Sequence, residues 1–396
     1  MPWKETSPVE EREEFIKSWS GHSRPAVVEL AEQYEISEKT AYKWIGRFRN
    51  EGSAGLRDRS RRPHHSPLAT AIEVRRQVVA FRLEHPSWGP KKIIAGLRRR
   101  DSELQLPSTS TVGAILAAEG LIRKRARRRR RGPRLQPFPA VRSPNDLWCM
   151  DHKGQFTVGR RRCYPLTVTD AHSRYLLTCE ACPSTAGKYV WPILERIFRE
   201  QGLPQRMRSD NGPPFGSLGI GGLSRLSVYL TRLGIQQEFI SPGRPQENGS
   251  HERMHGTLKR EAVLPPHSRW EAQQQRFDRF RDEYNLERPH EALQMKTPAE
   301  VYRSSSRPLP AKLPEVAYPT SFIVRRVKLS GEIKWRGGLV TISEMLRGEY
   351  VGIRESEQDG WWRLHYGYWD LGLLGADGTV IKRPRALLSS SPMSPV

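Results

Sequence analysis

Hydrophobic side chains recur at two different spacings along this chain of 396 residues, and the change of spacing divides it into parts. Residues 24–52 have the helical spacing, with Leu30 in a first helix and Trp44 in a second. Ser37 stands between the two segments, where a serine oxygen can accept from an unpaired backbone N–H of the second helix. The pattern predicts a helix, a short turn and a second helix.

Helical spacing also appears on both sides of this pair. An acidic amphipathic run, VEEREEFIKSW, precedes it and predicts the first helix of an N-terminal bundle. After it, residues 70–122 contain three apolar-periodic segments, the last of them preceded by Ser108 and Ser110 as alternative caps. We expect a second helical module there.

From about residue 140 the pattern changes to short apolar runs that alternate with helical segments. Three early strands joined by short turns, followed by strands separated by helices, indicate a mixed sheet flanked by helices. The expected strands are 146–157, 163–170, 174–181, 205–209 and 235–240, and the expected helices are 185–201, 223–234, 248–262 and 270–285.

The last part of the chain has short alternating runs with glycine turns, which predict a small β-barrel over 320–383. Its tryptophans are expected in the core, and its lysines and arginines are expected to give it a basic face. These residues are Trp335, Trp361, Trp362 and Trp369, and Arg325, Arg326, Lys328, Lys334 and Arg336.

The net charge of the chain indicates what kind of partner it binds. The formal net charge is +23, which favours a polyanion, and the chain has no run of 18 apolar residues that would place it in a membrane. Eight of the nine residues 123–131 are basic, so this block is expected to be extended and to follow phosphates. Nuclear targeting is the alternative use of such a block. We favour double-stranded DNA as the partner.

The second predicted helix of residues 24–52 resembles the recognition helix of a helix-turn-helix, which enters the major groove. The basic tail that follows is suited to the DNA backbone or the minor groove. A solvated charged face is the alternative. The candidate DNA contacts are Lys39, Thr40, Lys43 and Arg47 on the helix, and Arg59, Arg61 and Arg62 in the tail. The HPSWGPKKI segment in 70–122 resembles a second such motif, and a plain three-helix bundle is its equal alternative.

Three acidic residues are candidates for chemistry. Asp151 lies in an apolar run expected to be a strand, and Asp210 lies where a short strand meets an Asp-Asn-Gly-Pro turn. Glu252 lies near the start of a predicted helix, where Asn248 is a candidate cap. Carboxylates are the ligands that Mg²⁺ prefers, and two such ions can assist an in-line attack on phosphorus. A solvated surface charge is the alternative for each acid taken singly.

The contexts W-x-x-D, S-D-N-G-x-x-F and P-x-x-N-G-x-x-E-R resemble the DDE catalytic core of retroviral integrases and bacterial insertion-sequence transposases. The likeness continues through residues 223–235, 241–261 and 283–293 and covers about 140–300. It implies a ribonuclease-H-like core in which Asp151, Asp210 and Glu252 hold two Mg²⁺ ions, with Mn²⁺ as a substitute. The likeness of the C-terminal part to the integrase barrel rests on position and composition only.

The spacing of the acids departs from the family pattern. Asp210 and Glu252 are separated by 41 residues, which is longer than is usual, and the glycine-rich segment 216–225 is expected to absorb the excess as a loop. Glu247 would shorten the spacing, but it precedes the Asn-Gly pair and does not align with the family glutamate. We therefore assign the role to Glu252.

Several neighbouring residues have alternative interpretations. Lys259 is two helical turns beyond Glu252 and is either a DNA contact or a solvated lysine. His251 and His255 flank Glu252, but imidazole suits Mg²⁺ poorly and neither is taken as a ligand. Asp170 is a competing acid, for which a turn role with Ser173 and Arg174 is favoured.

Asn285, Arg288 and His290 match the family's YNxxRPH segment without a role that the sequence explains. Cys179 and Cys182 lack the second pair that a structural zinc needs, so buried free thiols are favoured for them and for Cys149 and Cys163.

The sequence therefore predicts a multidomain protein with N-terminal all-α helix-turn-helix modules, an α/β ribonuclease-H-like core with a mixed sheet, and a small C-terminal β-barrel. The expected parts are a helix-turn-helix domain with its basic arm at 1–65, a second helical domain at 66–122, an Arg-rich linker at 123–139, the catalytic core at 140–300, a linker at 301–319, the barrel at 320–383 and a tail at 384–396.

The resemblance implies a transposase that binds element ends and target DNA, works as a dimer or higher multimer, and acts in a bacterial cytoplasm at the nucleoid. It would cleave the 3′ ends and transfer them to the target. Two rivals remain: a ribonuclease-H-like nuclease that releases cut ends, and an inactive DNA-binding regulator derived from a transposase.

Overall fold

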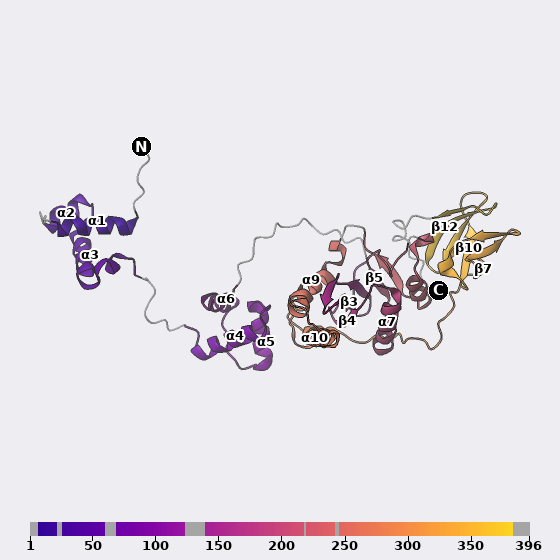
Figure 1. Ribbon diagram of the computed structural model, residues 1–396, viewed down its shortest axis with the longest axis horizontal. Coiled ribbons are helices and arrows are strands. Elements are labelled where there is room, and N and C mark those ends of the chain that lie inside the picture. Colours follow the sequence, from indigo (N-terminus) through magenta and orange to yellow (C-terminus); the bar gives the residue numbers. More distant parts are fainter. Residues whose placement is uncertain are drawn as a thin grey trace. The chain divides into compact units, whose positions relative to one another are not determined.

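The computed structural model describes residues 7–21, 26–59, 69–122, 139–217, 219–241 and 245–382 (Figure 1). The chain forms two compact units, residues 1–70 and 71–396. Among the described helices, none is both long enough and apolar enough to cross a membrane. The basic block 123–131 lies outside the described residues.

The first unit is a small helical domain. It consists of α1 (Pro8–Ser20), α2 (Val27–Gln33), α3 (Glu38–Glu51) and a 3-10 turn (Gly52–Leu56). Phe15, Leu30 and Trp44 meet in its core. Ser37 caps α3 by accepting from the Thr40 N–H at 3.3 Å, as predicted. The helix, turn and helix expected from the apolar spacing are confirmed.

The second unit begins with the predicted three-helix module, formed by α4 (Ile72–Glu84), α5 (Pro90–Arg100) and α6 (Thr109–Ala118). Trp88 is completely enclosed, and Phe81 packs so close to Gly96 that any side chain there would collide with its ring. Ser108, the first of the two candidate caps, accepts from the Thr111 N–H.

A mixed sheet forms the centre of the second unit. Its strands are β1 (Leu147–His152), β2 (Phe156–Val158), β3 (Arg161–Asp170), β4 (Leu176–Cys182), β5 (Arg206–Ser209) and β6 (Gln236–Phe239). The order is β2-β3-β1-β5-β6, with β4 paired to β3; β1, β5 and β6 are parallel and the other pairs are antiparallel. This arrangement confirms the predicted ribonuclease-H-like core.

Side chains alternate between the two faces of this sheet. Trp148 and Met150 face a core that also contains residues of α7 (Gly187–Gln201) and α8 (Arg225–Arg232). Cys163 and Leu176 face a second core formed with α9 (Gly249–Leu258) and α10 (Trp270–Asp282). Because neighbouring residues of a strand point to opposite faces, the odd-numbered positions of β1 face α9.

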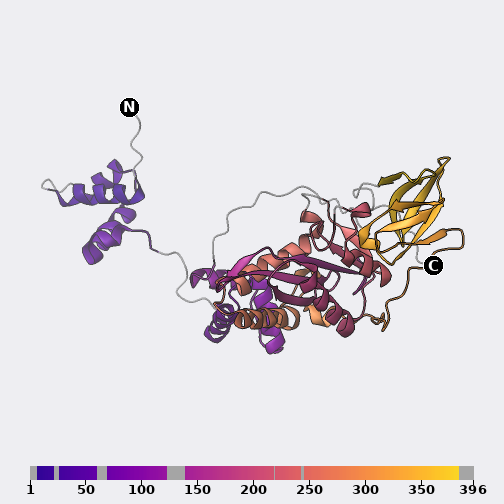
Figure 2. The same cartoon turned by 45° about the vertical axis from the view of Figure 1, so that its right-hand side comes forward.

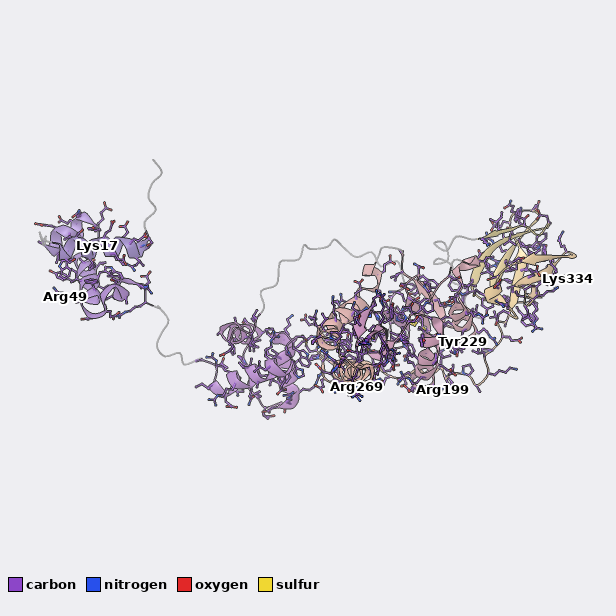
Figure 3. All side chains as sticks on the ribbon, in the orientation of Figure 1. Lys17, Arg49, Arg199, Tyr229, Arg269 and Lys334 are labelled. Carbon is purple, nitrogen blue, oxygen red and sulfur yellow. The ribbon has the colours of Figure 1, made fainter. Side chains whose placement is uncertain are left out.

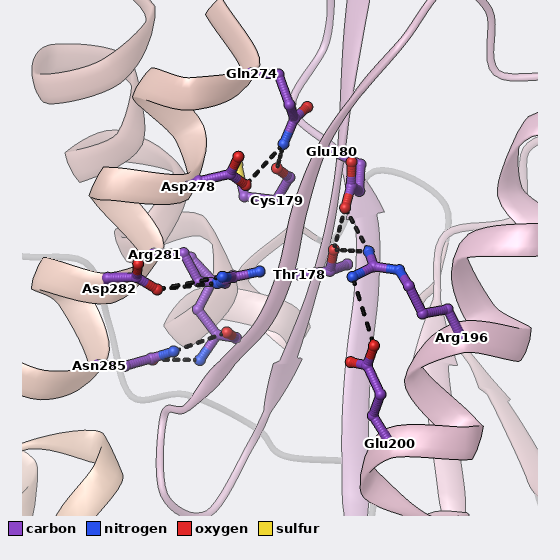
Figure 4. Close-up of polar contacts among 11 residues, drawn as sticks. Thr178, Cys179, Glu180, Arg196, Glu200, Gln274, Asp278, Arg281, Asp282 and Asn285 are labelled. Carbon is purple, nitrogen blue, oxygen red and sulfur yellow. Dashed lines mark hydrogen bonds and ion pairs between the residues drawn. The ribbon is translucent and has the colours of Figure 1, made fainter.

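Polar side chains fasten helices to β4 (Figure 4). Gln274 on α10 accepts from the Ala181 N–H at 2.8 Å. It also donates to the Cys179 carbonyl at 3.1 Å. On the other side, Arg196 of α7 pairs with Glu180. β4 is therefore held from both helical layers.

Short helical turns complete the core. Pi-helical turns extend α9 (Lys259–Val263) and α10 (Glu283–Glu287); the remaining turns are 3-10 segments at Ile220–Gly222, Pro245–Asn248 and Glu291–Leu293, followed by α11 (Pro298–Val301). The segment after α11 lies along the core, where Arg307 donates to the carbonyls of Pro204 at 2.7 Å and Leu233 at 2.9 Å.

The C-terminal strands form a sheet of their own (Figure 2). β13 (Val380–Lys382), β12 (Trp369–Gly375), β11 (Trp361–Tyr366), β10 (Tyr350–Glu355) and β7 (Ile323–Arg326) pair in that order, next to a hairpin of β8 (Glu332–Trp335) and β9 (Gly338–Thr341), with a 3-10 turn at Glu344–Leu346. The sheet is antiparallel, and within 323–382 no pairing of its edge strands closes it into the expected barrel.

Two tryptophans of the C-terminal strands confirm the expected core, since Trp335 on β8 and Trp369 on β12 are buried, whereas Trp361 and Trp362 are half-buried. The five basic residues of the predicted face are all exposed, including Lys334 on β8 (Figure 3).

The glycine-rich segment 216–225 has a different role from the one expected of it. Instead of a loop that only absorbs extra length, it places Ile220 and Leu223 in the hydrophobic core of the C-terminal sheet. Gly221 has φ +61°, and a Cβ atom there would be only 2.8 Å from the Leu371 side chain. The extra residues therefore attach the C-terminal sheet to the central core.

Candidate active site

Asp151 and Asp210 lie at the ends of two adjacent parallel strands. In the β1–β5 register Trp148 pairs with Met207 and Cys149 with Arg208, so Asp151 and Asp210 each follow two residues later. Positions in step on parallel strands project to the same face, which here is the face covered by α9. Asp210 also accepts from the Gly212 N–H at 3.1 Å, which fixes its turn.

Glu252 comes to this site from the first turn of α9, where it is exposed. Both of the other acids affect the pKa of the Asp151 carboxyl. Burial raises the pKa of the Asp151 carboxyl to about 7, and the negative charges of Asp210 and Glu252 contribute to the increase, while Lys153 opposes it. The fold thus places Asp210 and Glu252 within electrostatic range of Asp151.

Asn248 does not act as the cap that the sequence suggested. It ends the 3-10 turn Pro245–Asn248 with φ −115° and ψ 30°, whereas a capping residue needs extended backbone. Its side chain makes no capping hydrogen bond, and its Oδ1 is buried without a hydrogen-bond partner among the described residues.

Two histidines of α9 lie against Asp151, and the sequence analysis missed this position. His251 and His255 are 1% and 5% exposed, and both Nε2 atoms contact the Thr167 hydroxyl, at 2.8 and 2.7 Å. His255 Nδ1 is 3.7 Å from Asp151 Oδ2. Their i, i+4 spacing, which puts both rings on one face of the helix next to Glu252, was the available signal.

Burial keeps both imidazoles neutral. It lowers the pKa of His251 to about 3, and it lowers that of His255 as well, with the nearby His251 contributing. Neutral imidazole leaves one ring nitrogen of each histidine without a proton.

The donors at this site suit a divalent cation. Two carboxylates within electrostatic range of Asp151, together with burial that opposes the charge of Asp151, favour a bound positive charge. Oxygen ligands of this kind are those that Mg²⁺ takes, and Asp151, Asp210 and Glu252 would hold it. Ligand atoms of Asp151, His251 and His255 also lie within 4.8 Å of one another, a grouping that suits metals accepting nitrogen.

Asp170 has the turn role predicted for it. It is fully buried, and its Oδ1 accepts from both the N–H and the hydroxyl of Ser173 while its Oδ2 accepts from the Asn145 N–H at 2.7 Å. Arg174 follows in the left-handed conformation with φ +66°. Asp170 is therefore used to build the turn between β3 and β4.

All four cysteines are buried free thiols, as expected. Burial raises the pKa of Cys149 to about 11 and that of Cys163 and Cys182 to about 12, and it raises the pKa of Cys179 too. Inert thiols of this kind pack as small apolar side chains.

The predicted DNA contacts lie on separate segments. On α3, Lys39 and Lys43 are exposed, whereas the Thr40 hydroxyl is 2.9 Å from that of the capping Ser37. The charged ends of Lys43 and Arg47 each lie 4.9 Å from the centre of the Trp44 ring. DNA binding by these four residues stays a prediction.

Of the other predicted contacts, the structure describes Arg59 and Lys259. Arg59 is exposed and pairs with Glu51, and Lys259 is exposed directly after α9. Arg61 and Arg62 lie outside the described residues.

The YNxxRPH segment, whose role the sequence left open, joins parts of the second unit. Asn285 accepts from the Leu176 N–H at 2.8 Å and donates to the Leu176 carbonyl at 2.9 Å, so it holds the start of β4 (Figure 4). Arg288 pairs with Glu261 at 2.5 Å and lies over the Trp88 ring at 5.6 Å. It connects the α4–α6 module to the core.

Basic residues of α5 face the core as well. Lys91 pairs with Glu291 at 3.4 Å, and Arg99 pairs with Glu300 at 2.8 Å. Lys91 and Arg99 therefore have acidic partners within the chain.

Replacing Asn285 with Asp should destabilise the core by about 2–3 kcal/mol, because the buried carboxylate can no longer donate to the Leu176 carbonyl and faces it instead. Urea unfolding of the full chain measures the loss. Gln275→Glu, at an exposed position of α10, is the matched control and should cost less than about 0.5 kcal/mol. Equal costs for the two variants would contradict the role given to Asn285.

Comparison with known families agrees with this geometry. Two models described as integrase core domain match residues 141–245 and 233–298. A helix-turn-helix domain model matches residues 11–64, and a homeodomain-like domain model matches residues 40–116. The matches cover the segments that carry Asp151, Asp210 and Glu252, together with α3.

Similar proteins come from bacterial insertion elements. The chain is 27% identical over 282 residues to an uncharacterised 39.2 kDa protein of insertion element IS476 from Xanthomonas euvesicatoria, covering 70% of this chain and 75% of that protein. It is 25% identical over 275 residues to an uncharacterised 31.7 kDa protein of insertion element IS407 from Burkholderia multivorans, covering 68% and 92%. Among solved structures, the HTLV-2 integrase catalytic core domain in complex with magnesium matches 41% of this chain and 98% of its own, with 15% identity and a TM-score of 0.32.

Proposed function

Since this chain belongs to the bacterial insertion-sequence transposases with an integrase catalytic core, and is thus a DDE polynucleotidyl transferase, we propose that it cleaves the 3′ ends of a mobile element and transfers them into target DNA. The single observation that supports this most strongly is the register of β1 and β5, which puts Asp151 and Asp210 in step, with Glu252 of α9 close enough to affect the pKa of Asp151. The three acidic residues come from β1, from the turn after β5 and from α9.

The nucleophile in this proposal is not a side chain. Water first attacks the phosphodiester at the element end and frees a 3′-OH, and that hydroxyl then attacks a target phosphodiester. Two Mg²⁺ ions, or Mn²⁺ in their place, would supply activation of the attacking oxygen and charge neutralisation at the leaving oxygen. Asp151, Asp210 and Glu252 would hold them.

The chain itself determines where the three carboxylates lie. Asp151 lies on β1, which pairs with β5, and Asp210 directly follows β5; rigid strands hold a site more accurately than loops do. Glu252 lies at the N-terminal end of α9, where the helix dipole favours a carboxylate. The exposure of Glu252 leaves room for a DNA end beside it.

DNA recognition is proposed for the N-terminal modules. Lys39, Thr40, Lys43 and Arg47 on α3 would contact the terminal inverted repeats, with Arg59, Arg61 and Arg62 along the backbone or minor groove. Two element ends must be joined in one reaction, so the active form would be a dimer or higher multimer on DNA. We place this activity in the bacterial cytoplasm, at the nucleoid.

Affinity for DNA should fall by about 10³-fold or more between 50 and 200 mM salt, because binding that neutralises several phosphates releases their counterions. Fluorescence anisotropy with a labelled duplex measures it. A slope near zero in the plot of log affinity against log salt would contradict the assignment of the basic segments to DNA.

A joining assay tests the proposed reaction. The purified full chain, Mg²⁺ and a duplex that carries the element's own terminal repeat should give a 3′-cleaved end and a product joined to target plasmid. Cleaved ends without joined product would favour the ribonuclease-H-like nuclease. Binding to the repeat without cleavage would favour the inactive regulator.

A further inference from the structure

The hydroxyl of Thr167 has three hydrogen-bonding neighbours on the side of the sheet that faces α9. It lies 3.1 Å from the Asp151 backbone carbonyl, 2.8 Å from His251 Nε2 and 2.7 Å from His255 Nε2. A threonine hydroxyl has one proton to donate and two lone pairs to accept with. The three contacts therefore use its whole capacity, provided that one neighbour accepts and two donate.

This count assigns the protons of both histidines. The Asp151 carbonyl can only accept, so it takes the Thr167 proton, and both imidazoles must then donate through Nε2–H. The other ring nitrogen of His251 agrees with this assignment. Its unprotonated Nδ1 lies 2.7 Å from the Thr169 hydroxyl, which can donate a hydrogen bond to it.

The same assignment leaves His255 with a free lone pair on Nδ1. That nitrogen lies 3.7 Å from Asp151 Oδ2, so when the Asp151 carboxyl is ionised two electron-rich atoms face each other. Such a pair is stabilised by a cation that both atoms bind. We propose that His255 Nδ1 is a ligand, together with Asp151, of one catalytic divalent cation, and that this mixed site prefers Mn²⁺ to Mg²⁺.

Both the distance between His255 Nδ1 and Asp151 Oδ2 and the ligand preferences of divalent cations support a shared ion. Two ligand atoms about 2.1 Å from one ion lie about 3.0–3.4 Å apart at octahedral or tetrahedral angles, so a shift of a few tenths of an ångström closes the gap. Mg²⁺ selects oxygen ligands and octahedral geometry, whereas imidazole nitrogen suits the later transition metals. Mn²⁺ accepts both oxygen and nitrogen, and it is the cation to which we assign the site.

His251 has a different role in this arrangement. Both of its ring nitrogens are engaged by Thr167 and Thr169, so it has no lone pair left for a metal. It fixes the Thr167 hydroxyl, which in turn fixes the ring of His255. This is the outer-shell arrangement that commonly orients a metal-binding histidine.

Pulsed electron paramagnetic resonance of bound Mn²⁺ tests the inference, because an imidazole nitrogen bound to Mn²⁺ modulates the echo. The full chain should show this ¹⁴N modulation, and His255→Gln should lose it, since the glutamine amide can still donate to Thr167 but offers no atom at the Nδ1 position. Calorimetry should show Mn²⁺ affinity reduced about tenfold or more, with Mg²⁺ affinity changed less than about threefold.

His251→Gln, with the same residue type, helix face and burial, removes an outer-shell contact and no ligand, so it should keep the ¹⁴N signal even where Mn²⁺ affinity falls. His255→Asn is the second variant, because its oxygen can replace Nδ1; it should retain metal binding but lose the preference for Mn²⁺. Circular dichroism confirms that each variant is folded before its spectrum is compared.

The inference rests on the proposed function, and the measurements separate the two. Mn²⁺ binding that depends on Asp151 but shows no histidine nitrogen, or that is unchanged in His255→Gln, overturns the inference alone. Mn²⁺ binding that survives Asp151→Asn overturns the metal site on which the proposed function depends.

Discussion

Replacing Asp210 with Asn is expected to reduce cleavage and joining of element ends by about 10³-fold or more while leaving DNA affinity unchanged. The amide keeps the size of the side chain and its acceptor for the Gly212 N–H, but it removes the negative charge. Metal ions supply several kcal/mol of transition-state stabilisation at sites of this kind, and each 1.36 kcal/mol corresponds to about tenfold in rate.

The control for this variant is Asp282→Asn. Asp282 is an exposed acid near the end of α10 that pairs with Arg281 at 3.2 Å, so its loss should leave both activity and affinity intact. Rates come from the joining assay and affinities from anisotropy with the same duplex. An Asp210→Asn protein that cuts and joins at the wild-type rate would remove Asp210 from the reaction.

Replacing Glu238 with Gln is expected to destabilise the core by about 3 kcal/mol. Glu238 on β6 lies between two guanidinium groups of β5, pairing with Arg206 and, at 2.7 Å, with Arg208, and all three side chains are about one-tenth exposed. Breaking a buried pair leaves charge without compensation, which costs about 3–5 kcal/mol, and Asp146 lowers the cost here by still pairing with Arg206.

Urea unfolding, followed by tryptophan fluorescence, measures this loss. The control is Glu195→Gln on α7, which breaks an exposed pair with Arg199 at 2.6 Å and should cost under about 1 kcal/mol. Arg208 also donates to the Glu247 carbonyl at 3.0 Å and precedes Asp210 by two residues, so the Glu238 variant should also show reduced activity. Similar costs for Glu238→Gln and Glu195→Gln would contradict this account of the core.

The central sheet was largely predictable, because each strand carries an apolar run and each helix an apolar stripe. The expected strand 146–157 was wrong in one respect: the chain leaves the sheet after His152 and returns at Phe156, with Gly154 at φ +78°. The break follows His152, the residue next to Asp151. Apolar pattern alone could not show it, since residues on both sides are suited to a strand.

The acidic residues of the candidate site could be selected from the sequence, but the contacts of the residues around them could not. Asp151, Asp210 and Glu252 stood out by context, and their catalytic roles remain predictions. The contacts of His251 and His255 with Thr167 depend on the packing of α9 against β3, which joins residues more than 80 positions apart. The failure of Asn248 as a cap and the attachment of Ile220 to the C-terminal sheet have the same origin, since tertiary contacts override local preference.

Anomalous X-ray diffraction from crystals of the full chain soaked with Mn²⁺ tests the central claim most directly. Strong peaks should lie within about 2.0–2.4 Å of carboxylate oxygens of Asp151, Asp210 and Glu252, with one ion shared by the two aspartates. Peaks bound elsewhere, or none at these three carboxylates at saturating Mn²⁺, would contradict the claim that they form one metal-dependent active site.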